Sequence, residues 1–372
     1  MITVCEKDRC AGCMACLEIC PKHAISLQDD MVTMNAVIDE VKCIECGLCH
    51  QICQSNCPSK RSNPLLWWQG WSANSDVRRR SSSGGVAVSI ELAFIKSGGI
   101  VCSCNFEKGE FCFSFAESKE RILSFSGSKY VKSKPEQIYK RIKDLLRGGK
   151  KVLFVGLPCQ VSAVKNFVSE QFQEHLYTID LICHGTPSQK VLDLFLQQYG
   201  LKTEDLNDIS FRTKTNFRID SNSQYLSTLG TRDCYTISFL NALSYTENCY
   251  KCPYASLERV SDITLGDSWG SEMPKETQNE GISLILCQTE KGEELIANSE
   301  LELHEVELNK AVENNHQLQA PSKMPEKRKY FFESLQNGKP FNKTVMKCYP
   351  KQCIKQMVKG ILIKLRIVGG VK

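Results

Sequence analysis

The residues most capable of chemistry are cysteines, and eight of them fall into two runs with one spacing. Both runs have the form Cys-x2-Cys-x2-Cys-x3-Cys, the first at 10–20 and the second at 43–53. Three thiolates at two-residue gaps can hold three irons of one [4Fe-4S] cubane, and the fourth cysteine of each run ligates the opposite cluster. The spacing therefore predicts two clusters, one bound by Cys10, Cys13, Cys16 and Cys53 and the other by Cys43, Cys46, Cys49 and Cys20.

Zinc is the alternative that the cysteine pairs leave open, because such pairs also occur in zinc knuckles. A zinc ion takes four ligands, and a knuckle would leave the third cysteine of each run unused. We therefore favour iron-sulfur clusters. The second run departs from the pattern in one respect, since its Cys-Pro pair is displaced to Cys57-Pro58. Cys53 keeps the expected spacing and is the predicted ligand, and Cys57 is a spare.

The composition is that of an ordinary globular protein apart from its cysteines. The chain has 372 residues, of which 42% are hydrophobic and 24% charged, and 21 are cysteines. No apolar run precedes Cys5, so we expect no secretory signal and a cytoplasmic location, where dense cysteines are metal ligands and not disulfides. No apolar run approaches the roughly 20 residues of a membrane helix. The length allows two or three domains.

The formal charge of +5 does not indicate a nucleic-acid partner. That figure counts every cysteine as neutral, whereas a four-thiolate [4Fe-4S] site carries a net charge of roughly −2 when oxidised. Two or three such sites would bring the chain close to neutrality. We therefore expect no nucleic-acid binding.

The elements that must position this chemistry alternate between strands and helices. The patterns predict helices at 84–96, 135–146, 161–172 and 187–199, and strands at 100–104, 151–156, 177–183, 208–212, 261–265 and 282–287. Such alternation predicts a parallel or mixed α/β sheet. The fold class is thus α+β, with a bacterial-type two-[4Fe-4S] ferredoxin module at 1–58, a mixed α/β domain at 72–342 and a basic C-terminal helix at 343–372.

The C-terminal segment 343–372 differs in charge from the rest of the chain. It contains eight Lys or Arg and no Asp or Glu, and apolar residues recur at helical spacing from Ile354 to Leu365. A basic amphipathic helix can lie on an anionic membrane surface or dock a partner subunit. It can equally pack on its own domain with a solvated basic face.

Four more cysteines follow predicted strands or lie beside turn-forming residues. They are Cys159, Cys183 and the pair Cys249 and Cys252. Ligand sites of α/β sheets lie at strand ends, and four thiolates are the number that a third [4Fe-4S] cluster requires. A lone cysteine is more often a buried structural thiol. From spacing alone, a third cluster and structural thiols stay open.

Seven short motifs resemble those of a known family in sequence and in order. They are SSSGG at 81–85, GSKYV at 127–131, LPCQ at 157–160, DLICHG at 180–185, FRTK at 211–214, CxxCPY at 249–254 and GDSWG at 266–270. The family is that of the coenzyme F420 hydrogenase/dehydrogenase beta subunits, many members of which carry a ferredoxin module in front. The resemblance covers nearly all of the chain from about 80 to 330.

The resemblance implies an FAD-binding iron-sulfur oxidoreductase that passes electrons between one-electron clusters and a two-electron acceptor. In members that use it, the acceptor is the deazaflavin coenzyme F420. Carried onto this sequence, the ligands of the cluster nearest the flavin are Cys159, Cys183, Cys249 and Cys252. Three further cysteines of the second domain, Cys102, Cys104 and Cys112, are expected to be buried thiols.

The flavin site implied by the resemblance also agrees with local physical chemistry. Ser82, Ser83, Gly84 and Gly85 precede a predicted helix, whose positive end attracts a diphosphate, and glycine allows close approach. Cationic partners for phosphate or reduced flavin would be Lys129 together with Arg212 or Lys214. Within the motifs, the acid or base candidates are His184 and Asp267, for which a structural role is equally open.

Three functions remain compatible with the sequence. The leading hypothesis is a flavin-dependent iron-sulfur oxidoreductase that exchanges electrons with a redox partner protein and hydride with a small molecule, in either direction. The second is a non-catalytic electron-transfer adaptor that docks its partner enzyme through the basic tail. The third is a related enzyme acting on another organic substrate, since similar units reduce pigments or sulfur oxyanions or accompany surface-polysaccharide enzymes. Fold alone does not decide among them.

Overall fold

A mixed eight-stranded sheet organises most of the chain, and the computed structural model describes residues 2–221 and 224–367. Across the sheet, the strands are β14 (Leu301–His304), β4 (Leu66–Ser72), β13 (Ser283–Cys287), β12 (Ile263–Asp267), β8 (Leu176–Leu181), β7 (Val152–Gly156), β5 (Ile100–Glu107) and β6 (Glu110–Ala116). The four strands β12, β8, β7 and β5 run parallel, and the strands outside them pair antiparallel. The predicted mixed sheet is confirmed.

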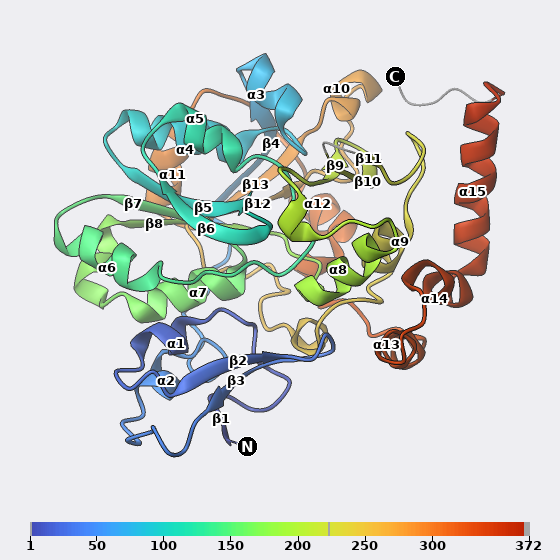
Figure 1. The fold of residues 1–372 in the computed structure, drawn as a ribbon. Helices are drawn as coiled ribbons and strands as arrows, with labels where there is room; N and C mark the ends of the chain where they lie inside the picture. The colour runs from blue at the N-terminus through green and yellow to red at the C-terminus, as the bar shows by residue number, and fades with distance from the viewer. Residues whose placement is uncertain (1, 222–223, 368–372) are drawn as a thin grey trace.

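Helices cover both faces of this sheet (Figure 1). One face carries α3 (Ser75–Arg80), α4 (Val86–Lys96), α5 (Lys119–Ser124) and α11 (Glu290–Ala297), and the other carries α6 (Tyr139–Arg147) and α7 (Pro158–Phe167). Strand β7 shows why both faces are covered, because it is buried throughout and alternate side chains enter opposite cores. Leu153 and Val155 pack with α4, whereas Val152 and Phe154 pack with α6 and α7.

A third, mostly helical region packs beside the sheet. It contains α8 (Gln189–Gln197), α9 (Cys234–Leu240), α13 (Arg328–Gln336) and α14 (Phe341–Cys348), together with a small sheet of β9 (Ser210–Thr213), β10 (Asn216–Ser221) and β11 (Gln224–Tyr225). Its core is rich in aromatic rings, among them Phe195, Tyr235 and Phe341, whose ring centroids lie 5.4 to 6.2 Å apart. The short helices α10 (Lys275–Asn279) and α12 (Leu308–Asn314) complete the fold.

The C-terminal segment contains two helices, where the sequence predicts a single basic one. Helix α14 begins at Phe341 and buries Val345 and Cys348 in the aromatic core, so it is part of the domain. Pro350 then starts α15 (Pro350–Lys364), because proline fits the first turn of a helix but cannot continue one. Residues 368–372 of the predicted tail lie outside the described residues. No helix within 2–221 or 224–367 is long and apolar enough to cross a membrane.

The N-terminal residues form a small module with two similar halves. Its three-stranded sheet has the order β1 (Ile2–Thr3), β3 (Met34–Ile38), β2 (Ile25–Asp29), and α1 (Ala15–Ile19) lies beside α2 (Leu48–Ile52). The two cysteine runs have the same backbone conformation. Gly12 and Glu45 are left-handed at equivalent positions, as are Met14 and Gly47. Repetition of the cysteine spacing thus produces repetition of structure.

The module docks on the helices α6 and α7 of the main domain (Figure 1). Glu18 of α1 accepts hydrogen bonds from the backbone amides of Ile138 (3.0 Å) and Lys140 (3.1 Å), at the start of α6. It therefore caps a helix of the other domain, since the first amides of a helix have no partner within it. The hydroxyl of Tyr139 donates to the carbonyl oxygen of Cys13, which ties the same helix to the first cysteine run.

We expect Glu18→Ala to weaken the attachment of the module, because it removes the acceptor for the backbone amides of Ile138, Tyr139 and Lys140 at the start of α6. Loss of a helix cap costs about 0.5–2 kcal/mol of unfolding free energy. Urea unfolding of the anaerobically purified protein measures this loss. Glu18→Gln is the matched variant, since its amide oxygen still accepts a hydrogen bond, and it should lose less. Equal stability of Glu18→Ala and the unaltered chain would contradict a capping role.

Candidate iron-sulfur and cofactor sites

The eight thiols of the N-terminal module divide into a buried set and an exposed set. Cys10, Cys13, Cys16 and Cys53 are all buried and line one small cavity. In the other set, Cys46 is exposed and the remaining three are half-buried, namely Cys20, Cys43 and Cys49. These are the two predicted ligand sets. Figure 1 places the module at one end of the molecule. Cys13 of the buried set packs in a core of the main domain, whereas Cys46 of the other set is exposed.

Two further cysteines bear on the ligand prediction. The spare cysteine, Cys57, is exposed and does not line the cavity of the buried set, whereas Cys53 does. Cys5 also lines this cavity, and its hydrogen bond lowers the pKa of Cys10 to about 7. Sequence reasoning missed Cys5 because it lies outside the repeated spacing, and only the pairing of β1 with β3 brings it here.

The four strand-end cysteines meet beside the buried set. Cys159 is the second residue of α7, Cys183 follows β8, and Cys249 and Cys252 belong to a short 3-10 helix at Glu247–Lys251 and its end. All four line one cavity of about 50 Å³. Burial, followed by the neighbouring thiols, raises the pKa of Cys183. The structure thus brings together four side chains that are up to 93 residues apart in the sequence (159 to 252).

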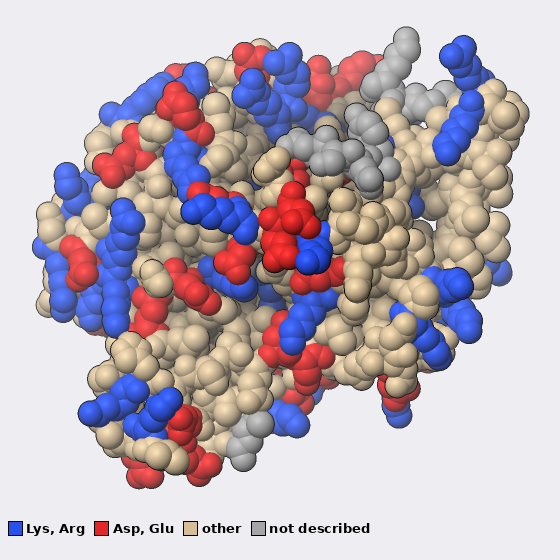
Figure 2. Space-filling model, viewed as in Figure 1, with Lys and Arg blue, Asp and Glu red and all other residues tan. Residues whose placement is uncertain are grey.

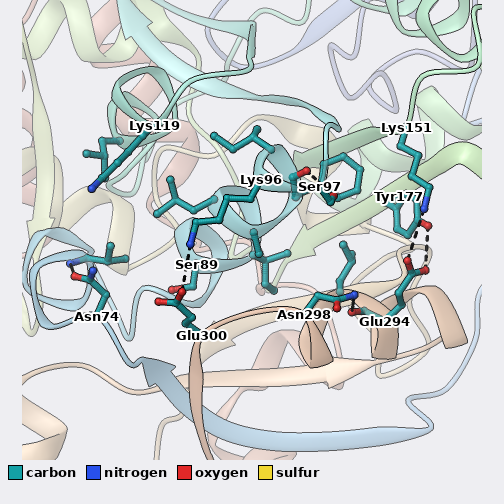
Figure 3. A pocket seen from close by; sticks show the side chains of 18 of the residues that line it. Asn74, Ser89, Lys96, Ser97, Lys119, Lys151, Tyr177, Glu294, Asn298 and Glu300 are labelled. Atoms are coloured by element: carbon teal, nitrogen blue, oxygen red, sulfur yellow. Dashed lines mark hydrogen bonds and ion pairs between the residues drawn. The ribbon is translucent and has the colours of Figure 1, made fainter.

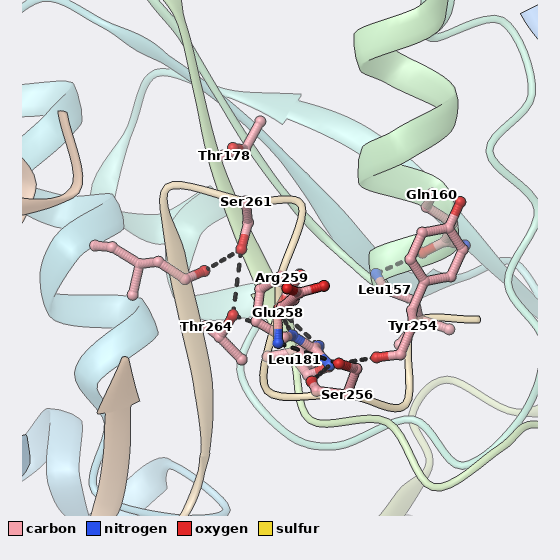
Figure 4. Close-up of polar contacts among 12 residues, drawn as sticks. Leu157, Gln160, Thr178, Leu181, Tyr254, Ser256, Glu258, Arg259, Ser261 and Thr264 are labelled. Atoms are coloured by element: carbon pink, nitrogen blue, oxygen red, sulfur yellow. Dashed lines mark hydrogen bonds and ion pairs between the residues drawn. The ribbon is translucent and has the colours of Figure 1, made fainter. Parts of the chain in front are cut away.

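A buried arginine holds the segments that carry three of these thiols (Figure 4). The Arg259 guanidinium bonds the Asp180 carboxylate at 2.8 Å, and both side chains are almost fully buried. It also donates to the carbonyl oxygens of Leu181 (2.9 Å) and Tyr254 (2.7 Å). Arg259 therefore joins the end of β8, just before Cys183, to the loop that follows Cys252.

Gly185 is required where the loop after β8 passes an aromatic ring. Its φ is 133°, and a Cβ at this position would lie 2.3 Å from Tyr245 Cδ2. Next to it, the Thr186 amide donates to Cys249 Sγ at 3.4 Å, and Thr186 accepts a bond from the Thr246 amide. The Cys183 loop and the Cys249 segment are thus held against each other.

A buried lysine lies between the N-terminal thiols and the strand-end thiols. Lys132 is 7% exposed, lines the cavity of the strand-end set and donates to the carbonyl oxygen of Ala11 at 3.0 Å. Burial raises the pKa of Cys159, and the charge of Lys132 opposes this shift. The same charge also helps to lower the pKa of Cys10. One cation therefore acts on thiols of both sets.

The thiols do not have the geometry of a mononuclear metal site. Within 2–221 and 224–367, no three His, Cys, Asp or Glu side chains converge closely enough to hold one metal ion. Zinc would require such convergence, whereas the thiolates of a [4Fe-4S] cluster ligate separate irons.

A cavity of about 400 Å³ adjoins the strand-end thiols and shares Cys183, His184 and Gly185 with their cavity. It lies at the carboxyl ends of the parallel strands, where α/β sheets bind ligands. Val155 and Gly156 of β7, Leu181 of β8 and the 265–267 end of β12 form part of its wall. Its volume is in the range of small-molecule and cofactor sites.

The start of α4 forms another wall of this cavity. Gly85 caps the helix with φ of 84°, and 86–88, the first helical residues, line the cavity. Their amides have no acceptor within the helix, so they present a positive helix end to a ligand. The hydroxyls of the preceding serines differ from expectation, because Ser83 donates to the carbonyl oxygen of Ile282 and Ser82 accepts from the Ser128 amide. The amides at the start of α4 are therefore free donors, whereas the Ser83 hydroxyl is already engaged as a donor.

Gly84, which the sequence also predicts to bind the flavin, has a packing role in this structure. It does not line the cavity among the described residues, and its amide donates to Ser283 Oγ at 3.1 Å. A Cβ at this position would lie 2.5 Å from the carbonyl oxygen of Gly70. Glycine is thus needed here for the close approach of the loop before α4 to strands β4 and β13.

The three predicted cations all hold the walls of the cavity. Lys129 lines it and donates to the carbonyl oxygen of Phe125 at 2.5 Å, and burial lowers its pKa. Arg212 lines it too and forms a two-fold ion pair with Asp267, at 2.5 and 2.8 Å. Lys214 does not line it, and donates instead to the carbonyl oxygens of Arg78 and Ser83. Burial, then the charges of Arg78 and Arg212, lowers the pKa of Lys214 to about 8.

The two acid or base candidates from the motifs have different surroundings. Asp267 is engaged by Arg212, so its carboxylate is held as an ion-pair partner. His184 lines both cavities, and burial lowers its pKa. Neutral His184 can therefore accept or donate a proton at the junction of the two cavities.

Sequence reasoning missed an acid in the cavity wall, Glu91. It lies in α4, lines the cavity and is 2% exposed. Burial raises its pKa from 4.5 to about 8, against the opposing effects of Lys129 and a hydrogen bond with Ser103. Its position within the apolar run 86–95 was the available signal, because a glutamate on the buried face of a helix is unusual.

Two other predicted thiols are less buried than expected. Cys102 is fully buried in β5, as expected, but Cys104 and Cys112 are only half-buried. Cys104 lines the large cavity, because β5 carries it past the end of β7.

A further cavity of about 750 Å³ lies elsewhere (Figure 3). It is near the amino ends of β7 and β8, at the opposite end of the sheet from the thiols. Four of its charged side chains form two pairs, Lys96 with Glu300 at 3.2 Å and Lys151 with Glu294 at 3.7 Å. These pairs leave no group of polar side chains that converges on one point, and the cavity lies far from the thiols, so we do not consider it a functional site.

The fold and these thiols define an iron-sulfur protein with a ferredoxin-like module in front of a mixed α/β domain. Residues 9–59 match the family model described as "4Fe-4S dicluster domain". Residues 149–311 match the model of the carboxyl-terminal part of the coenzyme F420 hydrogenase/dehydrogenase beta subunit. The resemblance to coenzyme F420 hydrogenase/dehydrogenase beta subunits read from the motifs is confirmed, with the family match at 149–311 and the dicluster match in front of it.

Individual relatives are distant. The F subunit of the F420H2 dehydrogenase of Methanosarcina mazei is 22% identical over 298 residues, which are 72% of this chain and 79% of that protein. An uncharacterized protein of Methanocaldococcus jannaschii is 25% identical over 197 residues, 44% of this chain and 54% of that one. Among solved structures, a chain of the F420-reducing [NiFe] hydrogenase complex from Methanosarcina barkeri has 18% identity and a TM-score of 0.46, covering 69% of this chain and 91% of that chain.

We expect Glu91→Gln to change how stability depends on pH. A raised pKa in the folded state means that, between about pH 4.5 and 8, the folded protein keeps a proton that the unfolded chain releases. Glu91 therefore lowers the unfolding free energy as pH rises through this window, by up to about 1.4 kcal/mol per pH unit.

Glu91→Gln should match the original chain near pH 4.5 and exceed it in stability at pH 8. Urea unfolding at pH 5, 6.5 and 8 measures the difference. Glu117→Gln, at an exposed position, is the control and should leave the pH dependence unchanged. Parallel pH curves for Glu91→Gln and the original chain would show that Glu91 ionises as an exposed glutamate does.

Proposed function

We propose that this protein is an iron-sulfur flavoprotein oxidoreductase that transfers electrons between ferredoxin-type [4Fe-4S] clusters and a two-electron acceptor. The observation that carries the proposal is the order of the sites. The exposed thiol set, the buried set, the strand-end set and the 400 Å³ cavity follow one another through the molecule. Such an order would provide a path between the outer thiols and the cavity at the strand ends.

The assignment of ligands follows from this order. Cys20, Cys43, Cys46 and Cys49 would hold the outer cluster, and Cys10, Cys13, Cys16 and Cys53 the inner one. Cys159, Cys183, Cys249 and Cys252 would hold a third. Cys13 packs in the same core as Cys159 and Cys252, which supports direct electron transfer between the inner and third clusters.

FAD fits the donor groups of the large cavity. The free amides at the start of α4 would bind its diphosphate, and Lys129 would add positive charge. When bound, FAD converts one-electron transfers into two-electron chemistry. Arg212 and Asp267 would hold the wall beside it, and Gly85 allows the backbone to approach closely.

Two groups of this chain would handle the proton that accompanies a hydride. Glu91, with its pKa near 8, can carry a proton at neutral pH inside the cavity. His184 lies where the thiol cavity and the large cavity meet. The physiological acceptor is a small molecule, and coenzyme F420 is the first candidate because the M. mazei relative is named as part of an F420H2 dehydrogenase.

An adaptor function is the second candidate. The exposed outer thiol set favours exchange of electrons with a partner protein, and the M. mazei relative is itself named as one subunit of a dehydrogenase. An adaptor would carry clusters without a flavin and pass electrons onward. A reductase of the same fold that acts on another organic substrate, such as one linked to polysaccharide biosynthesis, would keep the flavin and change the acceptor.

Metal and flavin analysis tests the proposal. Anaerobically reconstituted protein should contain about twelve irons and one FAD per chain, as three four-iron sites require. Cys249→Ser should lose electron flow from the N-terminal clusters to the flavin while those clusters remain. Cys112→Ser, a half-buried cysteine outside all three sets, is the matched control. About eight irons without flavin would instead indicate the adaptor.

We expect Lys132→Met to lower the reduction potentials of the inner and third clusters. A nearby positive charge stabilises the reduced, more negative cluster, and burial strengthens the effect. At a fixed potential the ratio of reduced to oxidised cluster should fall roughly tenfold, which is about 59 mV for a one-electron couple. Redox titration followed by electron paramagnetic resonance measures this.

The exposed cluster serves as an internal reference, since Lys132 does not contact its ligands among the described residues. Lys132→Arg should preserve the potentials because it keeps the charge. Lys134→Met removes an exposed cation two residues away and should also leave them unchanged. A uniform shift of all clusters in Lys132→Met would contradict a local electrostatic effect.

A further inference from the structure

The last helix, α15, rests on the protein through its polar and small side chains. Gln352 and Asn241 exchange two amide hydrogen bonds of 2.9 and 3.0 Å, and Gln356 accepts a bond from the Arg232 amide at 3.0 Å. Gly360 is buried on the same face. These contacts hold one side of the helix against α9 and the loop before it.

The opposite side of α15 exposes an apolar stripe. Its members are between 49% and 63% exposed and recur at three- and four-residue intervals, and they are Ile354, Met357, Val358, Ile361 and Leu365. A surface helix of a water-soluble domain normally turns such a stripe toward the core. In α15 the apolar stripe instead faces away from the core.

Cations flank this stripe, and no acid neutralises them within the helix. They are Lys351, Lys355, Lys359, Lys364 and Arg366, and none of them forms an ion pair among the described residues. The chain has no Asp or Glu after Glu333. At the right-hand edge of Figure 2, where Figure 1 places α15, the surface shows blue and tan but no red.

We propose that α15 docks the protein on an anionic lipid bilayer, with the apolar stripe at the boundary of headgroups and acyl chains. An in-plane amphipathic helix with Lys or Arg beside large aliphatic side chains binds such surfaces, and four to eight clustered cations indicate anionic lipid. The helix is about 22 Å long at 1.5 Å per residue. It stands at the edge of the molecule (Figure 1), so a flat surface can reach the whole stripe.

The charge pattern favours lipid over a protein partner. The cores of protein interfaces are depleted in lysine, whereas here lysines border the stripe along its length. Long lysine side chains can extend toward phosphate headgroups while their methylene groups lie along apolar surface. This inference does not depend on the bound cofactors or on the proposed reaction.

Vesicle sedimentation of the full-length protein tests the proposal. Binding to vesicles of equal parts phosphatidylglycerol and phosphatidylcholine should exceed binding to pure phosphatidylcholine at least tenfold. It should weaken as salt rises, because added ions screen the exposed cations. The double variants Met357→Ser/Ile361→Ser and Lys355→Gln/Lys359→Gln should each lower anionic binding at least tenfold.

Matched variants at other surface positions distinguish binding through α15 from nonspecific binding of the protein to vesicles. Leu65→Ser removes an equally exposed leucine, and Lys150→Gln/Lys323→Gln removes two exposed lysines, and both should bind as the original chain does. Circular dichroism and iron content confirm that each variant is folded. Failure of the original chain to bind anionic vesicles, equal binding to neutral ones, or equal loss in the control variants would overturn the proposal and leave a protein partner as the occupant.

Discussion

A buried ion pair between Arg259 and Asp180 is the interaction on which the strand-end thiols depend. Asp180 is the penultimate residue of the central strand β8, three residues before Cys183, and Arg259 follows the segment of Cys249 and Cys252. Arg259 also donates to backbone carbonyls and to the Thr264 hydroxyl, so its charge is well partnered. One oxygen of Asp180 accepts from Arg259, and the other has no hydrogen-bond partner among the described residues. An unpaired charge at this depth would be strongly destabilising. The pair therefore specifies one spatial arrangement of two segments that are distant in sequence.

Buried and half-buried lysines recur around the proposed electron path. Lys132 lies between two thiol sets, Lys129 lies in the wall of the large cavity, and Lys214 holds the loop before α4. Each of them donates to backbone carbonyl oxygens, which replace part of the lost hydration. Carbonyl dipoles cannot neutralise a full charge, so these lysines remain available to anionic clusters or phosphates. Some of the positive charges behind the formal net charge of +5 thus lie inside the protein.

Much of the central fold could be predicted from hydrophobic pattern. The predicted strands at 100–104, 151–156 and 177–183 correspond to β5, β7 and β8, because strands buried on both faces are continuously apolar. Strands β4, β6 and β14 were missed, since they lie toward the edges and mix polar with aromatic residues. Glu91 and Lys132 were also missed, because a charged residue shows its burial only when its neighbours are in place.

The local chemistry is contained in the amino-acid sequence. Within each N-terminal run the cysteines are close along the chain, so a few dihedral angles decide their placement, and equal spacing yields equal conformation at Met14 and Gly47. The meeting of Cys159, Cys183, Cys249 and Cys252, the protonation of Glu91 and the outward orientation of α15 were decided by the tertiary structure. They depend on burial and on distances between remote segments, which exist only when the whole chain is packed.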